Sequence, residues 1–179
     1  MLRDEIIQEL ERFKKYVVSQ SRANLTRGGK NVSKKLYNSI NGETFASKKG
    51  SSIGLYFEME DHGSYQDQGV KGKTSSNRAP NSPYKFGTGT GTEGGLTEGI
   101  KAWVKAKRIQ FKSKEEGAKG RFLSYDQTAR LITRAIYNKG LKPSYFFTKP
   151  FNKAFERLPN DIVDRYGLVL EELLKQNLK

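Results

Sequence analysis

The first 24 residues carry the pattern that most constrains the fold. Apolar side chains recur there at three- and four-residue intervals, which places them along one face of an α-helix. They are Leu2, Ile6, Leu10, Phe13 and Val17, with Ile7 and Val18 beside them. Such a helix owes most of its stability to packing of its apolar face. The rest of the chain must therefore supply a layer that covers it.

Residues 43–59 provide one such layer. Ile53, Leu55, Phe57 and Met59 alternate with more polar residues, which is the period of a strand with one buried face. An earlier stretch, residues 43–46, provides a partner strand, and a turn rich in lysine separates the two. The pattern predicts an antiparallel hairpin.

The remaining patterns are mostly helical. They predict short helices over 33–40 and 97–107, and a longer helix that begins at Ser124 and ends at Gly140. They also predict a strand over 144–148 and helical segments over 151–158 and from Pro159 onward. The predicted structural residues are Trp103, Pro150, Phe151 and Phe155. The fold class is therefore α+β, with a small antiparallel sheet packed by the long N-terminal helix and the C-terminal helices.

Residues 69–99 interrupt this arrangement. They hold eight of the 18 glycines and two of the five prolines. Glycine-rich sequence has little to bury, so it predicts a long, mobile loop. The sequence therefore predicts one domain over residues 1–179, with residues 70–121 as an inserted, flexible, basic arm.

Positive charge is concentrated in that arm. The chain has 33 Lys and Arg against 19 Asp and Glu, a net charge of +14, and residues 70–121 hold 12 of the basic and four of the acidic residues, a net +8. Such a balance favours DNA or an acidic neighbour, although a solvated basic surface remains the alternative. The residues predicted to face DNA or a partner are Lys101, Lys105, Arg108, Lys112, Lys114, Lys119 and Arg121.

Residues suited to catalysis are scarce. The chain has no cysteine and one histidine, His62, so the sequence predicts neither an enzyme, nor a cofactor, nor a metal site. Glu58, Glu60, Asp61 and Asp67 form the densest acidic group, which could bind Mg²⁺ or pair with nearby cations. A small metal-dependent nuclease therefore remains one alternative. No apolar run approaches the ~18 residues that span a bilayer, and the N-terminus is not typical of a signal peptide.

Three motifs occur in a recognisable order. Residues 36–40 have a Leu-x-x-Ser-Ile pattern, residues 65–69 place a tyrosine before an acidic residue and a glycine, and residues 146–155 carry an aromatic-Pro-Phe element. This order resembles the neck or tail-completion proteins of tailed bacteriophages, which form the head-to-tail connector. Residues 69–72, residues 79–84, Trp103 and residues 120–122 are similar to segments of a variant found in crAss-like phages.

The resemblance implies a structural virion protein made in the host cytoplasm. It implies a homo-oligomeric ring that joins the portal or adaptor protein to tail proteins, with packaged DNA passing through the lumen without sequence preference and with no membrane partner. The residues it implies for a subunit-interface arm are Tyr65, Asp67, Gly69, Pro80, Pro83 and Tyr84. A free, non-sequence-specific nucleic-acid-binding protein is the other alternative function.

Overall fold

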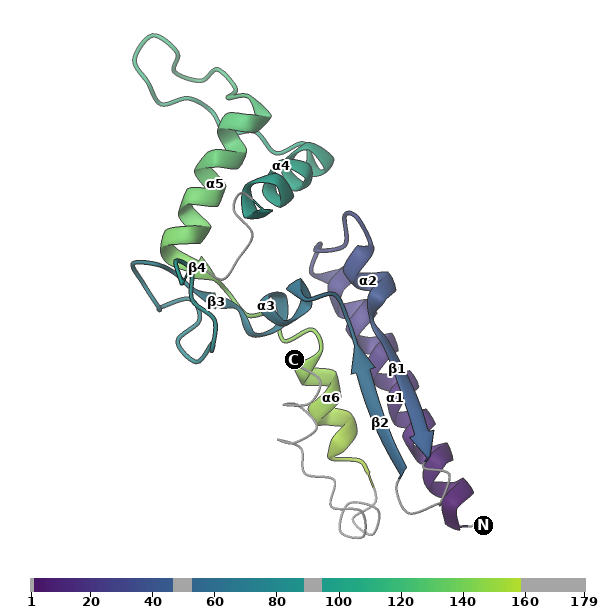
Figure 1. The fold of residues 1–179 in the computed structure, drawn as a ribbon. Helices are drawn as coiled ribbons and strands as arrows, with labels where there is room; N and C mark the ends of the chain where they lie inside the picture. Colours follow the sequence, from purple (N-terminus) through teal and green to yellow (C-terminus); the bar gives the residue numbers. More distant parts are fainter. Residues whose placement is uncertain (1, 47–52, 89–94, 159–179) are drawn as a thin grey trace. The chain divides into compact units, whose positions relative to one another are not determined.

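The computed structural model describes residues 2–46, 53–88 and 95–158 (Figure 1). Its contacts divide the chain into two compact units. The first unit contains residues 1–67 and 144–179, and the second unit contains residues 68–143. The predicted helix from Pro159, the lysine-rich turn of the hairpin and residues 89–94 of the glycine-rich segment lie outside the described residues.

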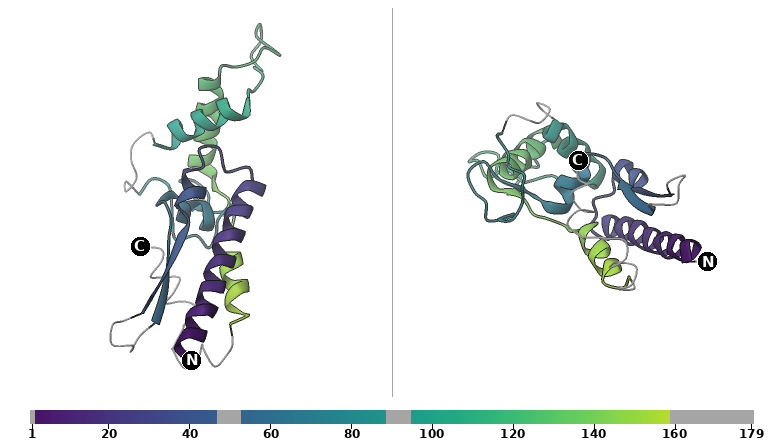
Figure 2. Two further views of the ribbon diagram at one scale, coloured as in Figure 1. Left: turned by 90° about the vertical axis from the view of Figure 1, so that its right-hand side faces the viewer. Right: turned by 60° about the horizontal axis from the view of Figure 1, so that its bottom comes forward.

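The predicted N-terminal helix is confirmed as α1, Leu2–Arg27, in the first unit. Its predicted apolar face is buried at Ile6, Leu10, Phe13 and Val17, and Leu25 is almost completely covered as well. The hairpin and helix α6 both run alongside α1, as Figures 1 and 2 show from three directions. The α+β class is therefore confirmed, and α1 is the element against which the rest of this unit packs.

The predicted hairpin is also confirmed. Strands β1, Asn41–Ala46, and β2, Ile53–Glu58, pair antiparallel in a register that places Thr44 opposite Leu55. Leu55 and Phe57 are buried against the core. Asn-Gly pairs often form turns, but Asn41 and Gly42 are the first residues of β1. The short helix before them is α2, Lys35–Ser39.

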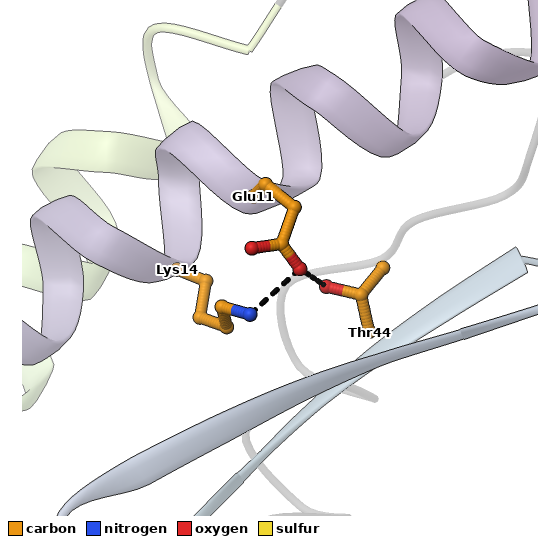
Figure 3. Close-up of polar contacts among 3 residues, drawn as sticks. All are labelled: Glu11, Lys14 and Thr44. Atoms are coloured by element: carbon orange, nitrogen blue, oxygen red, sulfur yellow. Dashed lines mark hydrogen bonds and ion pairs between the residues drawn. The ribbon is translucent and has the colours of Figure 1, made fainter.

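A carboxylate joins the hairpin to α1. Glu11 accepts hydrogen bonds from the Lys14 ammonium and from the Thr44 hydroxyl, each at 2.6 Å (Figure 3). The bonds from Lys14 and then Thr44 lower the pKa of Glu11. On the inward face of the hairpin, β1 therefore contacts α1 through the polar Thr44, whereas β2 contributes the apolar Leu55 and Phe57 to the core.

Helix α6, Thr148–Phe155, completes the core of the first unit. The ring of Phe151, which is 1% exposed, lies edge-on to Phe13 at 5.2 Å, and it is 5.9 Å from Phe57 and 5.8 Å from Phe147. Phe155 stacks on Phe151 at 6.3 Å from the partly buried edge of the cluster. Phe151 and Phe155 therefore have the structural role that the sequence predicts.

The predicted strand over 144–148 is wrong. Residues 144–147 are irregular, and α6 begins at Thr148, so Pro150 lies in the first helical turn, where its missing N–H has no helical partner to lose. The backbone N–H of Ser144 donates to the carbonyls of Gln66 and Asp67, and that of Tyr145 donates to Asp67. The N–H groups of Ser144 and Tyr145 are therefore bonded to residues 66 and 67 and do not pair with a neighbouring strand.

Helix α3, His62–Gln68, was not predicted, and it supplies the partner for α6. Its Asp67 is 1% exposed. One carboxylate oxygen accepts from the N–H groups of Phe147 at 2.8 Å and Thr148 at 3.2 Å, and the other accepts from the Thr148 hydroxyl. Asp67 thus satisfies the open donors at the start of α6 from a remote position in the sequence.

Burial raises the pKa of Asp67 above its ordinary value. The hydrogen bonds from Thr148 and Phe147, together with the positive charge of Lys30, oppose that rise without cancelling it. The folded chain therefore binds a proton at this carboxylate more readily than the unfolded chain does.

The second unit contains helices α4, Gly95–Lys107, and α5, Tyr125–Lys139, and a two-residue antiparallel pair, β3, Val70–Lys71, with β4, Gly140–Leu141. The predicted start of α5 is confirmed. Ser124 accepts from the N–H of Gln127, and the Gln127 side chain accepts in return from the N–H of Ser124, which completes a capping box. Gly140, at φ 90°, closes the helix.

The described part of the glycine-rich segment makes buried contacts that its composition does not predict. Ala79 and Ser82 are buried, and the Ser82 hydroxyl donates to the carbonyl of Gly69 at 2.7 Å. Gly69 has φ 74°, and a Cβ there would lie 2.5 Å from the carbonyl oxygen of Leu141. Small residues allow backbone segments to pack on one another here, so a core forms without large apolar side chains. The single domain and the flexibility of residues 70–121 stay predictions.

We predict that Asp67→Ala lowers the free energy of unfolding by about 2–4 kcal/mol, because it leaves buried donors at the start of α6 unpaired. Asp67→Asn should cost less, since its carbonyl oxygen can still accept from both N–H groups. Urea unfolding followed by circular dichroism measures both changes. Equal losses in the two variants would contradict the capping role.

The raised pKa of Asp67 also predicts a pH dependence. The contribution of the protonated side chain is complete below the unfolded pKa of about 3.9 and is lost as pH rises through the folded pKa. The free energy of unfolding of the wild type, minus that of Asp67→Asn, should therefore fall as pH rises across this window. A difference that rises with pH would show that the pKa is lowered instead.

Candidate nucleic-acid interface

Most of the net positive charge belongs to the second unit. Residues 68–143 contain 16 Lys and Arg against five Asp and Glu, a net +11, whereas the remaining residues contain 17 against 14, a net +3. The predicted concentration of charge thus extends beyond residues 70–121. A unit with this balance attracts polyanions through its whole field.

Helices α4 and α5 form the scaffold of this charged unit. Val104 of α4 is 0% exposed and Ala129 of α5 is 1% exposed, and the two helices pack on one another. Val104 is therefore the most deeply buried apolar residue of α4. Trp103, predicted to anchor this helix, is buried only in part, as is Ile100.

Arg108 ends α4 in an unusual conformation. Its φ is 53°, in the left-handed region that favours glycine. The N–H of Arg108 donates to the carbonyl of Lys105, and the N–H of Ile109 donates to that of Val104. These two bonds make a Schellman motif with an arginine where glycine is usual. The motif turns the chain from α4 into the loop that follows.

That loop, residues 108–123, is here called the basic loop. Figure 1 shows it extending beyond the ends of α4 and α5 that it connects. Its arms are joined because Ser113 donates to Arg121 and accepts from Gly120, and Leu123 donates to Phe111. At its base the Phe111 N–H donates to the buried hydroxyl of Thr128 at 3.2 Å. The basic loop is thus a short ribbon held by α5.

The structure leaves six of the seven predicted basic residues exposed. None of these six forms an ion pair with any of the described residues; they are Lys105, Arg108, Lys112, Lys114, Lys119 and Arg121. Lys101 differs, because it is half-buried and its ammonium lies 3.3 Å from a carboxylate oxygen of Asp126. Lys101 is therefore partly neutralised within the subunit, whereas the other six are available to an outside anion.

Several exposed residues extend this surface beyond the prediction. Phe122 is 66% exposed and Phe111 is 43% exposed, and the Lys112 ammonium lies 5.4 Å from the centre of the Phe122 ring. Arg130 and Arg134 are exposed on α5, four residues apart and hence on one face. The arginine spacing was visible in the sequence, but nothing in it distinguished an exposed phenylalanine from a core one.

The residues predicted for a subunit-interface arm separate into two groups. Asp67 and Gly69 are buried and serve the fold of their own units, so they offer no surface to a neighbouring subunit. Tyr65, Pro80 and Pro83 are exposed and Tyr84 is half-buried. For these four the interface role stays a prediction.

The acidic group does not gather into one site. Glu58, Glu60 and Asp61 are exposed, whereas Asp67 is buried and both of its oxygens accept hydrogen bonds. Within residues 2–46, 53–88 and 95–158, no three acidic or histidine side chains lie where they could hold a metal ion. No helix in the same ranges is long and apolar enough to cross a membrane.

Comparison of the chain with protein-family models, with curated proteins and with solved structures gives no match. The chemistry of the surface is therefore the basis for any functional conclusion. Ammonium and guanidinium groups on a protruding loop can neutralise phosphates, and phosphate contacts carry no sequence information. The site is suited to binding nucleic acid by charge rather than by reading bases.

Arg108→Gly separates the fold of this site from its charge. Glycine adopts the left-handed conformation without strain, so we predict a free energy of unfolding that is unchanged or raised by up to about 1 kcal/mol. Loss of one cation should reduce the slope of log binding constant against log salt by about 0.9 on duplex DNA. Fluorescence anisotropy at several salt concentrations measures this slope. Lys142→Gln, an exposed charge outside the basic loop, is the control, and an unchanged slope for Arg108→Gly would exclude Arg108 from the interface.

Proposed function

We propose that this chain is a structural protein of the bacteriophage head-to-tail connector. In this proposal identical subunits form a ring that joins the portal or adaptor protein to the tail, and the packaged DNA passes through it. The protein acts by binding and not by catalysis.

The observation that carries the proposal is that residues from all three motifs of the resemblance help to build the first unit, although the second motif ends in the second unit. Leu36 and Ile40 of the first motif are buried in the core of the first unit, and Asp67 of the second satisfies the N-terminus of α6. The third motif is α6 itself, with Phe151 at the centre of the aromatic cluster. Motifs that build one core support a shared fold, because an accidental likeness would leave them scattered.

The charge distribution supports the DNA part of the proposal. A connector lumen must admit any sequence, so it needs cations without base-reading groups. The second unit offers a net +11 and a protruding basic loop. A free nucleic-acid-binding protein is a second candidate, favoured by the exposed Phe111 and Phe122 among these cations, since aromatic rings can stack on unpaired bases.

The proposal is tested by removing charge from the end of α4 and the tip of the basic loop. We predict that changing Lys105, Lys107, Arg108 and Lys114 together to Gln leaves the subunit folded but reduces DNA retention or ejection by the particle. A matched variant changes four exposed lysines elsewhere to Gln, namely Lys35, Lys139, Lys142 and Lys153. Complementation of a phage that lacks the gene, followed by particle counts and DNA-release assays, measures the effect.

Wild-type assembly, retention and ejection in the first variant would contradict the channel-facing role of these cations. Particles that assemble fully without any copy of the chain would contradict the connector role itself. Tight binding to single-stranded DNA by an isolated monomer, with no place in the particle, would favour the second candidate.

A further inference from the structure

The two most exposed large hydrophobic side chains among the described residues lie on surfaces of opposite charge. They are Phe122 at 66% and Phe45 at 50%. Phe122 belongs to the basic loop of the second unit, and Phe45 belongs to β1 of the first unit. Aromatic residues are enriched at protein interfaces relative to the rest of the surface, so the surroundings of these two rings show whether either belongs to one.

The surface around Phe45 is here called the hairpin outer face. It consists of the hairpin residues that point away from α1, which by the strand register are Asn41, Glu43, Phe45, Gly54, Tyr56 and Glu58. The Phe45 ring lies over Gly54, where a Cβ would come within 2.3 Å of it. The ring centres of Phe45 and Tyr56 are 6.3 Å apart. The face therefore presents a formed aromatic pair.

Carboxylates flank this aromatic pair. Glu43 and Glu58 are exposed on the same face, and none of its six residues is basic. The Tyr56 hydroxyl donates a hydrogen bond to Glu43, which orients that carboxylate and raises the pKa of Tyr56 to about 12. An acidic face on a chain of net charge +14 repels nucleic acid and favours a cationic partner.

The basic loop has the complementary chemistry. Lys112 lies directly across the ribbon from Phe122, so both point to the same side. Arg121 precedes Phe122 and pairs with Ser113, so it starts on the other side of the ribbon but adds positive charge next to the ring. The basic loop as a whole has five basic and two acidic residues. The basic loop presents an aromatic ring beside a lysine, and the hairpin outer face presents an aromatic pair between two carboxylates. The rings of the two surfaces can therefore pack together while their opposite charges attract.

We propose that the side of the basic loop bearing Phe122 and Lys112 in one copy docks on the hairpin outer face of the next copy. This inference rests on the proposed ring, because a ring needs two different surfaces on each subunit that fit each other head to tail. In the docked state Phe122 packs against Phe45 and Tyr56, and Lys112 lies close to Glu43 and Glu58. The neighbouring Arg121 adds to the attraction through its charge. The cations at the end of α4 remain free for DNA.

Charge reversal tests this contact on the full-length protein. The loop variant carries Lys112→Glu and Arg121→Glu, and the face variant carries Glu43→Lys and Glu58→Lys. All four positions are exposed, so both variants should fold. Sedimentation velocity of the wild type at low salt should show self-association that weakens as salt is raised. Each variant alone should associate about tenfold more weakly or worse.

An equimolar mixture of the two variants should restore association, because each reversed surface then meets its complement. Phe122→Ala and Phe45→Ala, by contrast, should give dimers but no larger species when mixed, since only one intact pair of surfaces remains. The control variant, Lys139→Glu with Lys142→Glu, makes the same charge change on the same unit and should associate like the wild type.

A wild type that remains monomeric at millimolar concentration and low salt would overturn the inference, as would a charge-reversal mixture that stays monomeric. If the wild type and every variant assemble equally, this contact is wrong although a ring through other surfaces stands. If both variants assemble normally but the loop variant alone loses DNA binding, the Phe122 side of the basic loop faces nucleic acid and the inference fails.

Discussion

The buried carboxylate of Asp67 is the contact on which the first unit depends. It lies at the end of α3, where the chain leaves this unit, and it accepts from the first N–H groups of α6, where the chain returns. The same two segments are joined by backbone bonds from Ser144 and Tyr145. Helix α6 carries Phe151 into the aromatic cluster, so this polar contact also fixes where the helix that completes the core begins.

This arrangement allows the second unit to be built under different constraints. Its core consists of small residues and a few aliphatic ones, such as Ala79, Val104 and Ala129. It can therefore carry most of the net charge and a protruding loop without a large apolar core. This division is consistent with a first unit that supplies the stable apolar core and a second unit that binds charged partners.

The elements with a regular hydrophobic period were predictable from the sequence. The spacing of apolar residues predicts helix α1 and the hairpin. Ser124, a residue typical of a helix N-cap, predicts the start of α5. Residues 144–147 were mistaken for a strand because aromatic composition does not reveal that Asp67, far away in the chain, takes their hydrogen bonds. In the candidate site the cations were predictable as charges, whereas the exposure of Phe122 depends on tertiary structure alone.

The central claim is that this chain forms a ring between the head and the tail of a phage particle. A reconstruction of the portal-to-tail junction of the parent particle by electron cryo-microscopy tests it most directly. The account predicts a closed ring of copies of this chain around the DNA, with the cations at the end of α4 facing the DNA. A junction that contains no copy of the chain, or a particle that carries it elsewhere, would contradict the account.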